Sequence, residues 1–164
     1  MDIRTMTLND LEQVLDLQRR CYPPQYHEPM SAFDNKLRRS PGSSWLAVSS
    51  GQTVAYLVTL PVDEAHFPAL HGSDWQAPEQ ARWLYLHDLA VDPAHRGGGA
   101  GQRLIDQALA QARELGLGGL ALVAVQGSQP YWSRHGFRPQ SVTHAGLLER
   151  LRGFGDGAQF MVRD

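Results

Sequence analysis

The sequence lacks most features that would assign it to a membrane, an oxidising compartment or nucleic acid. Its 164 residues include one cysteine, Cys21, which excludes an internal disulfide and a cysteine-based zinc site. No run of about 18 apolar residues occurs, and residues 1–10 lack the basic-then-apolar pattern of a signal peptide. A formal net charge of −2 offers no basic field for phosphate backbones. We therefore expect a cytoplasmic protein with no nucleic-acid partner and no membrane association.

Metal-ligand spacing is also missing. The histidines other than His87 show no convincing spacing with cysteine, aspartate or glutamate, so no metal is expected. A length of 164 residues and a hydrophobic content of 42% are sufficient for one sizeable core. Residues 1–164 are therefore expected to form one domain.

Hydrophobic periodicity predicts an alternation of strands and helices. Strands are expected around Ile3, at 45–49, 53–60, 83–91 and 119–125, from Phe137 onward and at 159–163; helices are expected at 8–20, 31–39, 102–115, 130–135 and 147–151. A capping box of Thr7 and Asp10 starts the first helix, and Ser31 is expected to cap the second. The second and third strands read as an antiparallel hairpin, and the strand–helix–strand unit that follows predicts a parallel pair.

Two segments bear on a functional site. Residues 61–82 contain three prolines and no sustained period, so they form either a lid or pocket wall or a plain surface excursion. The strand at 83–91 is apolar on both faces, which is typical of a central strand. Strict alternation places His87 on one face with Tyr85 and Leu89, and Asp88 on the opposite face.

A glycine-rich turn joins this strand to the next helix. Its sequence, Arg96, Gly97, Gly98, Gly99, Ala100, Gly101, lies where unpaired amides and the positive end of the helix dipole favour an anion. The alternative is a plain tight turn. A Walker A loop does not fit, because no lysine follows the glycines, and the dinucleotide pattern G-x-G-x-x-G cannot be placed on them. ATP, GTP and NAD are therefore disfavoured as ligands.

The turn resembles the acyl-CoA pyrophosphate loop of the GNAT superfamily of N-acetyltransferases. Arg96, Gly99 and Gly101 match its pattern of Arg or Gln, two residues, Gly, one residue, then Gly or Ala. The stretch 89–93 before the loop is similar to the family's strand end, and 131–137 resembles its Phe-Tyr-x-x-x-Gly-Phe segment. The resemblance implies an α+β fold with a mixed, mostly antiparallel sheet of about six or seven strands, a central splayed parallel pair and flanking helices.

The same resemblance implies acetyl-CoA as the acyl donor. The backbone of Leu89, Ala90 and Val91 would pair with the pantetheine arm. The residues expected to hold the pyrophosphate are Arg96, Gly97, Gly98, Gly99, Ala100, Gly101 and Gln102. Gln126, with Ser128 nearby, takes the place of a polar residue that often contacts the cofactor in the family. Many relatives pair through late strands, so a homodimer through 160–162 is an expectation by analogy.

Acetyl transfer to an amine requires a base, because alkyl amines are almost wholly protonated near neutral pH. His87 stands on the central strand just before the proposed acyl site, and an imidazole suits proton removal at this pH. Its alternative role is that of a satisfied core histidine. The string Leu86-His87-x-Leu89-Ala90-Val91 resembles the arylalkylamine N-acetyltransferases.

Trp132 stands where the family has its usual tyrosine acid. The indole N–H donates a hydrogen bond but is not a useful proton source. Trp132 is therefore expected either to pack on the pantetheine and donate to sulfur, with water supplying the proton, or simply to pack the helix. Tyr131, about 100° away on a helix, is expected to face elsewhere.

Three functions remain open at this point. The first is acetylation of a small-molecule amine, with Tyr26, Phe67 and Trp75 walling a closed pocket. The second is acetylation of protein N-termini or lysines, which needs an open peptide groove. The third is an acyl-CoA-binding module without turnover, for which the missing tyrosine is the hint.

Overall fold

The computed structural model describes residues 1–69, 74–125 and 127–164. The strands are β1 (Asp2–Thr5), β2 (Ser44–Ser49), β3 (Gln52–Val62), β4 (Trp83–Val91), β5 (Leu120–Ala124), β6 (Arg138–Pro139) and β7 (Gln159–Arg163). The α-helices are α1 (Leu11–Cys21), α2 (Met30–Arg39), α3 (Ala100–Glu114), α4 (Gln129–Arg134) and α5 (Ala145–Arg152). Short 3₁₀ turns are η1 (Leu8–Asp10), η2 (Pro24–Tyr26) and η3 (Pro93–His95).

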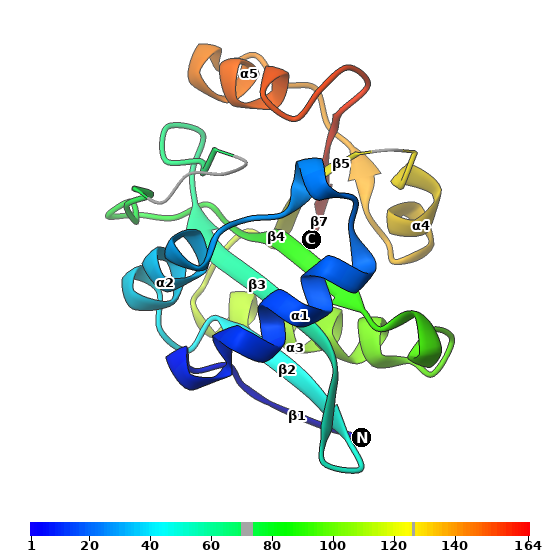
Figure 1. The fold of residues 1–164 in the computed structure, drawn as a ribbon. Helices are drawn as coiled ribbons and strands as arrows, with labels where there is room; N and C mark the ends of the chain where they lie inside the picture. Colours follow the sequence, from blue (N-terminus) through cyan, green and yellow to red (C-terminus); the bar gives the residue numbers. More distant parts are fainter. Residues whose placement is uncertain (70–73, 126) are drawn as a thin grey trace.

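The strands form one seven-stranded sheet in the order β1-β2-β3-β4-β5-β7-β6. Among its pairs β4 and β5 are parallel, and the others are antiparallel. The helices α1 and α2 cover one face and α3 covers the other (Figure 1). The predicted mixed sheet with a central parallel pair and flanking helices is therefore confirmed.

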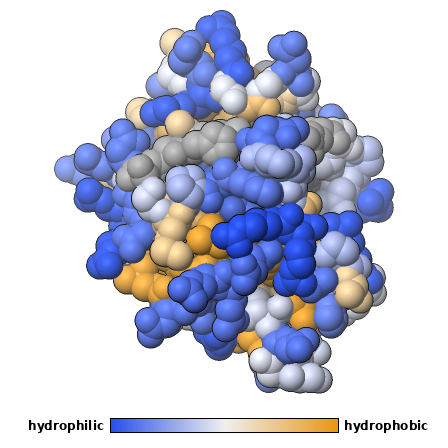
Figure 2. Space-filling view, in the orientation of Figure 1, coloured by the Kyte–Doolittle hydropathy of each residue, from blue (hydrophilic) through white to orange (hydrophobic). Residues whose placement is uncertain are grey.

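Three apolar clusters hold these layers together. One joins α3 to the sheet through residues such as Leu104, Ile105 and Leu57, and a second joins α1 and α2 to the opposite face around Val14 and Phe33. The third lies around the first half of β4, with β5, β7 and part of the segment between β3 and β4. Outside these clusters the face with α1 and α2 is largely hydrophilic, with apolar side chains gathered near its centre and left (Figure 2).

The predicted helix starts are partly correct. The capping box is present, because the amide of Thr7 donates to the Asp10 carboxylate at 2.8 Å. Ser31 does not cap α2: the helix begins at Met30, and Pro29 is the preceding residue. Pro29 fixes an extended backbone there, which favours a helix start at the next residue.

The segment between β3 and β4 contributes to the core. Phe67 and Trp75 are buried in the third cluster, and the Trp75 indole donates to the carbonyl of His66 at 2.9 Å. This segment therefore packs into the core at Phe67 and Trp75, whereas residues 76–80 are largely exposed. His71 and the rest of 70–73 lie outside the described residues.

A β-bulge in β4 corrects the predicted alternation of its side chains. Val58 of β3 pairs with Asp88, but the next residue, Thr59, pairs with Leu86, so His87 is the extra residue. A bulge of this kind reverses the alternation beyond it. Leu89 therefore packs toward α3, and His87 and Asp88 both project toward α1 and α2.

Candidate active site

The parallel strands β4 and β5 separate at the centre of the sheet. They pair only over 84–86 and 120–122, whereas β4 continues to Val91 against β3 and β5 continues to Ala124 against β7. A cavity of about 720 Å³ opens where they separate. Its walls come from both strands, the glycine turn, α4 and the segment between α1 and α2.

The backbone groups of Leu89 and Val91 lie on the edge of β4 that β5 leaves unpaired. The amide of Asp92 donates to the carbonyl of Val54 in β3 at 2.8 Å. Backbone groups of successive strand residues point to opposite sides, so the backbone of Ala90, two residues before Asp92, also faces β3. The Leu89 carbonyl accepts a hydrogen bond from the Tyr22 hydroxyl, and the Val91 carbonyl accepts one from Cys21 at 3.3 Å. The amides of Leu89 and Val91 thus remain on the edge facing the cavity, and Ala90 does not share this position.

The glycine turn leads directly into α3. Gly97 and Gly99 have φ values of +85° and +86°, which L side chains rarely adopt. Gly99 is the N-cap of α3, so the amides of Ala100, Gly101 and Gln102 have no acceptor in the helix. Arg96, Gly97, Gly99, Ala100, Gly101 and Gln102 line the cavity, whereas Gly98 is not among its lining residues. The helix dipole adds to these donors, and the turn is suited to an anionic group.

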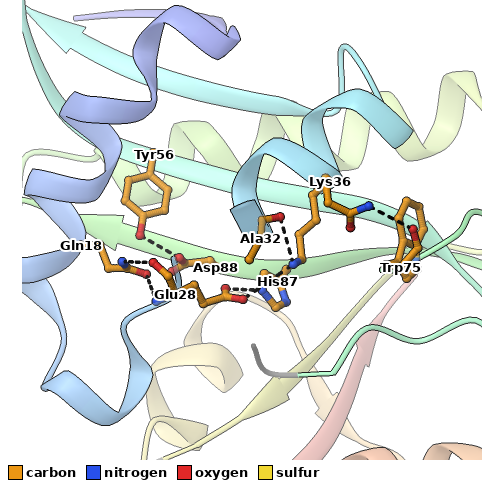
Figure 3. Close-up of polar contacts among 9 residues, drawn as sticks. Gln18, Glu28, Ala32, Lys36, Tyr56, Trp75, His87 and Asp88 are labelled. Carbon is orange, nitrogen blue, oxygen red and sulfur yellow. Dashed lines mark hydrogen bonds and ion pairs between the residues drawn. The ribbon is translucent and has the colours of Figure 1, made fainter. Parts of the chain in front are cut away.

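His87 lies in a buried polar cluster on the face with α1 and α2. Its Nε2 is 2.5 Å from Glu28 Oε1, and Glu28 Oε2 is 3.7 Å from Lys36 Nζ. The three side chains are 1%, 4% and 1% exposed. Figure 3 shows Glu28 beside His87, with Lys36 of α2 next to the ring. His87 and Glu28 also line the cavity, so this cluster forms part of its inner wall.

The position of Glu28 is fixed by α1. The side-chain amide of Gln18 donates to the Glu28 carbonyl at 3.0 Å, and its oxygen accepts from the Glu28 amide at 2.9 Å. Gln18 is itself buried, so this two-point contact is shielded from water. Nothing in the sequence indicated Glu28, because it is 59 positions from His87.

Asp88 is the neighbour of His87 on the same face. Its carboxylate accepts a hydrogen bond from the Tyr56 hydroxyl at 2.7 Å. Burial raises the pKa of Asp88 from 3.8 to about 6, and the nearby His87 opposes this rise. The prediction that Asp88 cannot share a side with His87 is wrong, because the bulge was not visible in the alternation.

Tyr131 lies at the cavity together with Trp132. A Cβ on Gly101 would lie 2.8 Å from the Tyr131 hydroxyl, so Tyr131 reaches the first turn of α3. His135, one helical turn later, meets Gln102 at 2.8 Å on the same side. Trp132 packs edge-on against Phe137, with ring centroids 5.6 Å apart, beside the α3 core. Both rings line the cavity, and the prediction that Tyr131 faces elsewhere is wrong.

Of the other residues proposed from the sequence, some line the cavity and some do not. Ser128 lines the cavity and its hydroxyl accepts from the Val125 amide at 3.1 Å, whereas Gln126 lies outside the described residues. Of the expected aromatic walls Tyr26 lines the cavity, and Phe67 and Trp75 belong to the core instead. No cluster of three or more potential metal ligands occurs in the described ranges, and no helix there is long and apolar enough to span a membrane.

Comparisons with known proteins assign the family. The model of the Acetyltransferase (GNAT) family matches residues 11–137, and the chain belongs to this family. A comparison with curated proteins gives no significant match. The family is one of acetyltransferases, and solved structures with bound CoA or acyl-CoA share the fold of this chain.

Solved structures share the fold over nearly the whole chain. A GNAT-like decarboxylase, GphF, in complex with isobutyryl-CoA is 21% identical, with a TM-score of 0.76 over 99% of this chain and 97% of that one. The PaiA N-acetyltransferase from Thermoplasma acidophilum in complex with coenzyme A is 13% identical, with a TM-score of 0.68 over 99% and 98%. N-acetylglutamate synthase from Neisseria gonorrhoeae with coenzyme A and N-acetyl-glutamate is 18% identical, with a TM-score of 0.69 over 99% of this chain and 34% of that one.

Proposed function

We propose that the protein transfers an acetyl group from acetyl-CoA to the primary amine of a small molecule. The observation that carries this proposal is a single cavity that joins an anion-binding glycine turn to a buried histidine–carboxylate pair through the gap between β4 and β5. The turn suits a pyrophosphate, and the pair suits proton removal from an amine. These are the two ends of an acetyl-CoA:amine reaction.

The cofactor would lie along the open edge of β4. The amides of Leu89 and Val91 would pair with the pantetheine arm as an added strand, while Arg96 and the turn amides would hold the pyrophosphate. Ser128 and Gln126 follow β5 and would contact the arm from the other strand. Family neighbours with bound CoA or acyl-CoA support this arrangement.

The chemistry then divides among three positions. His87 would take the proton of the amine, directly or through one water, at the inner end of the cavity. The Leu89 amide would stabilise the oxyanion that forms on the thioester carbonyl. Trp132 would donate a hydrogen bond to sulfur. The Tyr131 hydroxyl, whose pKa is raised by burial, would remain protonated and could supply a proton to the departing thiolate.

A small acceptor is supported by the walls of the inner cavity. Tyr22, Tyr26, Tyr85 and Phe154 line the cavity, the centroid of the Tyr85 ring lies 5.7 Å from that of the His87 ring, and Phe154 and Tyr85 are buried. Aromatic walls around few polar groups are typical of a small-molecule site. The fold is also shared with N-acetylglutamate synthase, whose product is an N-acetylated amino acid. The resemblance to arylalkylamine N-acetyltransferases adds aryl-alkyl amines to the acceptors worth testing.

The test is thiol release from acyl-CoA across a panel of aryl and alkyl amines, amino acids and short peptides. Acetyl-CoA, isobutyryl-CoA and malonyl-CoA are compared as donors, and His87→Gln is run alongside. We expect one class of small amine to turn over with acetyl-CoA, and His87→Gln to lower kcat by roughly 10²–10⁴-fold.

Three results would contradict the proposal. Turnover of peptides alone would make the chain a protein acetyltransferase. Release of CO₂ from malonyl-CoA without an amine would make it a decarboxylase. Tight binding of acetyl-CoA with no turnover of any acceptor would make it a binding module.

A further inference from the structure

We propose that Glu28 is the positioning residue of His87: it holds the ring in the tautomer that carries its proton on Nε2 and leaves Nδ1 as the proton-accepting atom. The inference rests on the proposed acetyl transfer for its kinetic consequence, but the tautomer itself does not depend on turnover. Glu28 lies in the short segment between η2 and α2, far from His87 in the sequence.

The contact between the two side chains determines the direction of the hydrogen bond. Glu28 Oε1 lies 2.5 Å from Nε2, and an ionised carboxylate can only accept. Lys36 Nζ, 3.7 Å from the other oxygen, favours the ionised form of Glu28. The proton of a neutral ring therefore lies on Nε2. Carboxylates orient histidine rings in the same way in catalytic triads.

The second ring nitrogen has a different environment. Nδ1 is buried and has no hydrogen-bond partner among the described residues. A buried acceptor without a partner is unfavourable, and a donor that enters the cavity would relieve this cost. His87 and Glu28 both line the cavity, so an amine at its inner end is such a donor.

Charged groups of both signs lie around the ring. Glu28 and Asp88 are acidic, Lys36 is basic, and Tyr85 and Tyr22 are tyrosines whose pKa values burial raises, so they stay neutral. With both carboxylates and the lysine ionised the cluster has a net charge of −1, and a proton on the ring brings it to zero. Asp88, with a pKa of about 6, contributes its charge only above that pH.

The resulting step is balanced. The amine attacks in its neutral form, after the ammonium has lost one proton to solvent. Its nitrogen forms a bond to the thioester carbonyl carbon with its lone pair, and the C–S bond breaks with its electron pair on sulfur. The proton lost by nitrogen goes to Nδ1 of His87. The CoA thiolate takes up one proton, from Tyr131 or from water. Glu28 touches none of the reacting atoms and acts only through the ring.

The first experiment measures the tautomer by NMR of ¹⁵N-labelled histidine rings. His87→Gln identifies the His87 signals, and acetyl-CoA is left out, so catalysis is not required. In the unaltered protein we expect the proton on Nε2 and a bare Nδ1. A ring with its proton on Nδ1 would overturn the proposal, whatever the variants do.

The second experiment compares Glu28→Gln with Glu149→Gln. Glu149 is a matched control, a surface carboxylate 74% exposed that pairs with Arg152 at 2.9 Å. A glutamine can donate as well as accept, so Glu28→Gln should lose the preference for the Nε2 proton, and Glu149→Gln should keep it. An unchanged tautomer in folded Glu28→Gln would contradict the positioning role.

The kinetic consequence is measured with the acceptor found in the amine panel. Glu28→Gln should lower the plateau kcat by roughly tenfold and leave KM for acetyl-CoA unchanged. The rise of kcat with pH should also move to lower pH, because the protonated ring loses a charged neighbour. A uniform loss of kcat at every pH would mean that Glu28 is only structural. If no amine turns over in the unaltered protein, the proposed function fails, while the NMR result still decides the role of Glu28.

Discussion

Replacement of Gly99 by alanine tests the backbone geometry of the glycine turn. Gly99 has φ +86° and ψ 5°, and a Cβ there would meet nothing within 4 Å. Gly99→Ala should therefore lower the free energy of unfolding only through backbone strain, by about 1–2 kcal/mol for an L residue in the left-handed region. For a chain of 164 residues that loss lowers Tm by roughly 2–8 °C.

Gly98→Ala is the control in the same turn. Gly98 does not have a positive φ, and its Cβ would only touch the His95 carbonyl at 3.4 Å. Both variants are measured without ligand, by thermal and urea unfolding. We expect Gly99→Ala to lose stability and Gly98→Ala to change little. If the backbone of Gly99→Ala relaxes to a negative φ at residue 99, the first amides of α3 move. One charge-assisted hydrogen bond to the pyrophosphate is then lost, and the CoA affinity measured by calorimetry should fall roughly tenfold. Equal stabilities of the two variants would refute the reasoning.

Three further predictions follow from single contacts. Gly119→Ala should cost more than 3 kcal/mol in urea unfolding, roughly the upper range for single substitutions, because its Cβ would overlap the Arg163 carbonyl; a cost below about 1 kcal/mol would contradict the geometry. Between about pH 4 and 6 the folded state holds more protons at Asp88 than the unfolded chain does. The free energy of unfolding relative to Asp88→Asn should therefore fall by roughly 2–3 kcal/mol as the pH rises from about 4 to 6; a constant difference would contradict the pKa of about 6. Tyr131→Phe should lower kcat about tenfold with little change in Tm, and an unchanged kcat would leave water as the acid.

The order of strands and helices could be predicted because it depends on local patterns, whereas the gap between β4 and β5 was implied by the family resemblance. The apolar strand at Trp83–Val91, the glycine turn and the helix after it have clear periodicity and spacing. The turn also needs glycine at positions with positive φ, so its conformation is present in the residue types themselves. The structure contains this turn at the cavity, and its role in binding an anion stays a prediction.

His87 was proposed from the sequence, but its surroundings at the other end of the cavity could not be predicted in the same way. The bulge at His87 depends on how β4 pairs with β3, and it reverses the faces of every residue after it. Glu28 reaches the ring only because Gln18 of α1 holds its backbone by two hydrogen bonds. Tyr131 reaches α3 because α4 packs beside that helix, and neither contact is encoded by nearby residues.

The central claim is that acetyl-CoA binds along the open edge of β4, and residue-level amide hydrogen exchange tests it most directly. With saturating acetyl-CoA, the account predicts slower exchange at the amides of Leu89 and Val91 and at the first amides of α3. Ala90, whose backbone faces β3, should not change. If acetyl-CoA binds and the amides of Leu89 and Val91 exchange as before, the cofactor lies elsewhere and the account is wrong.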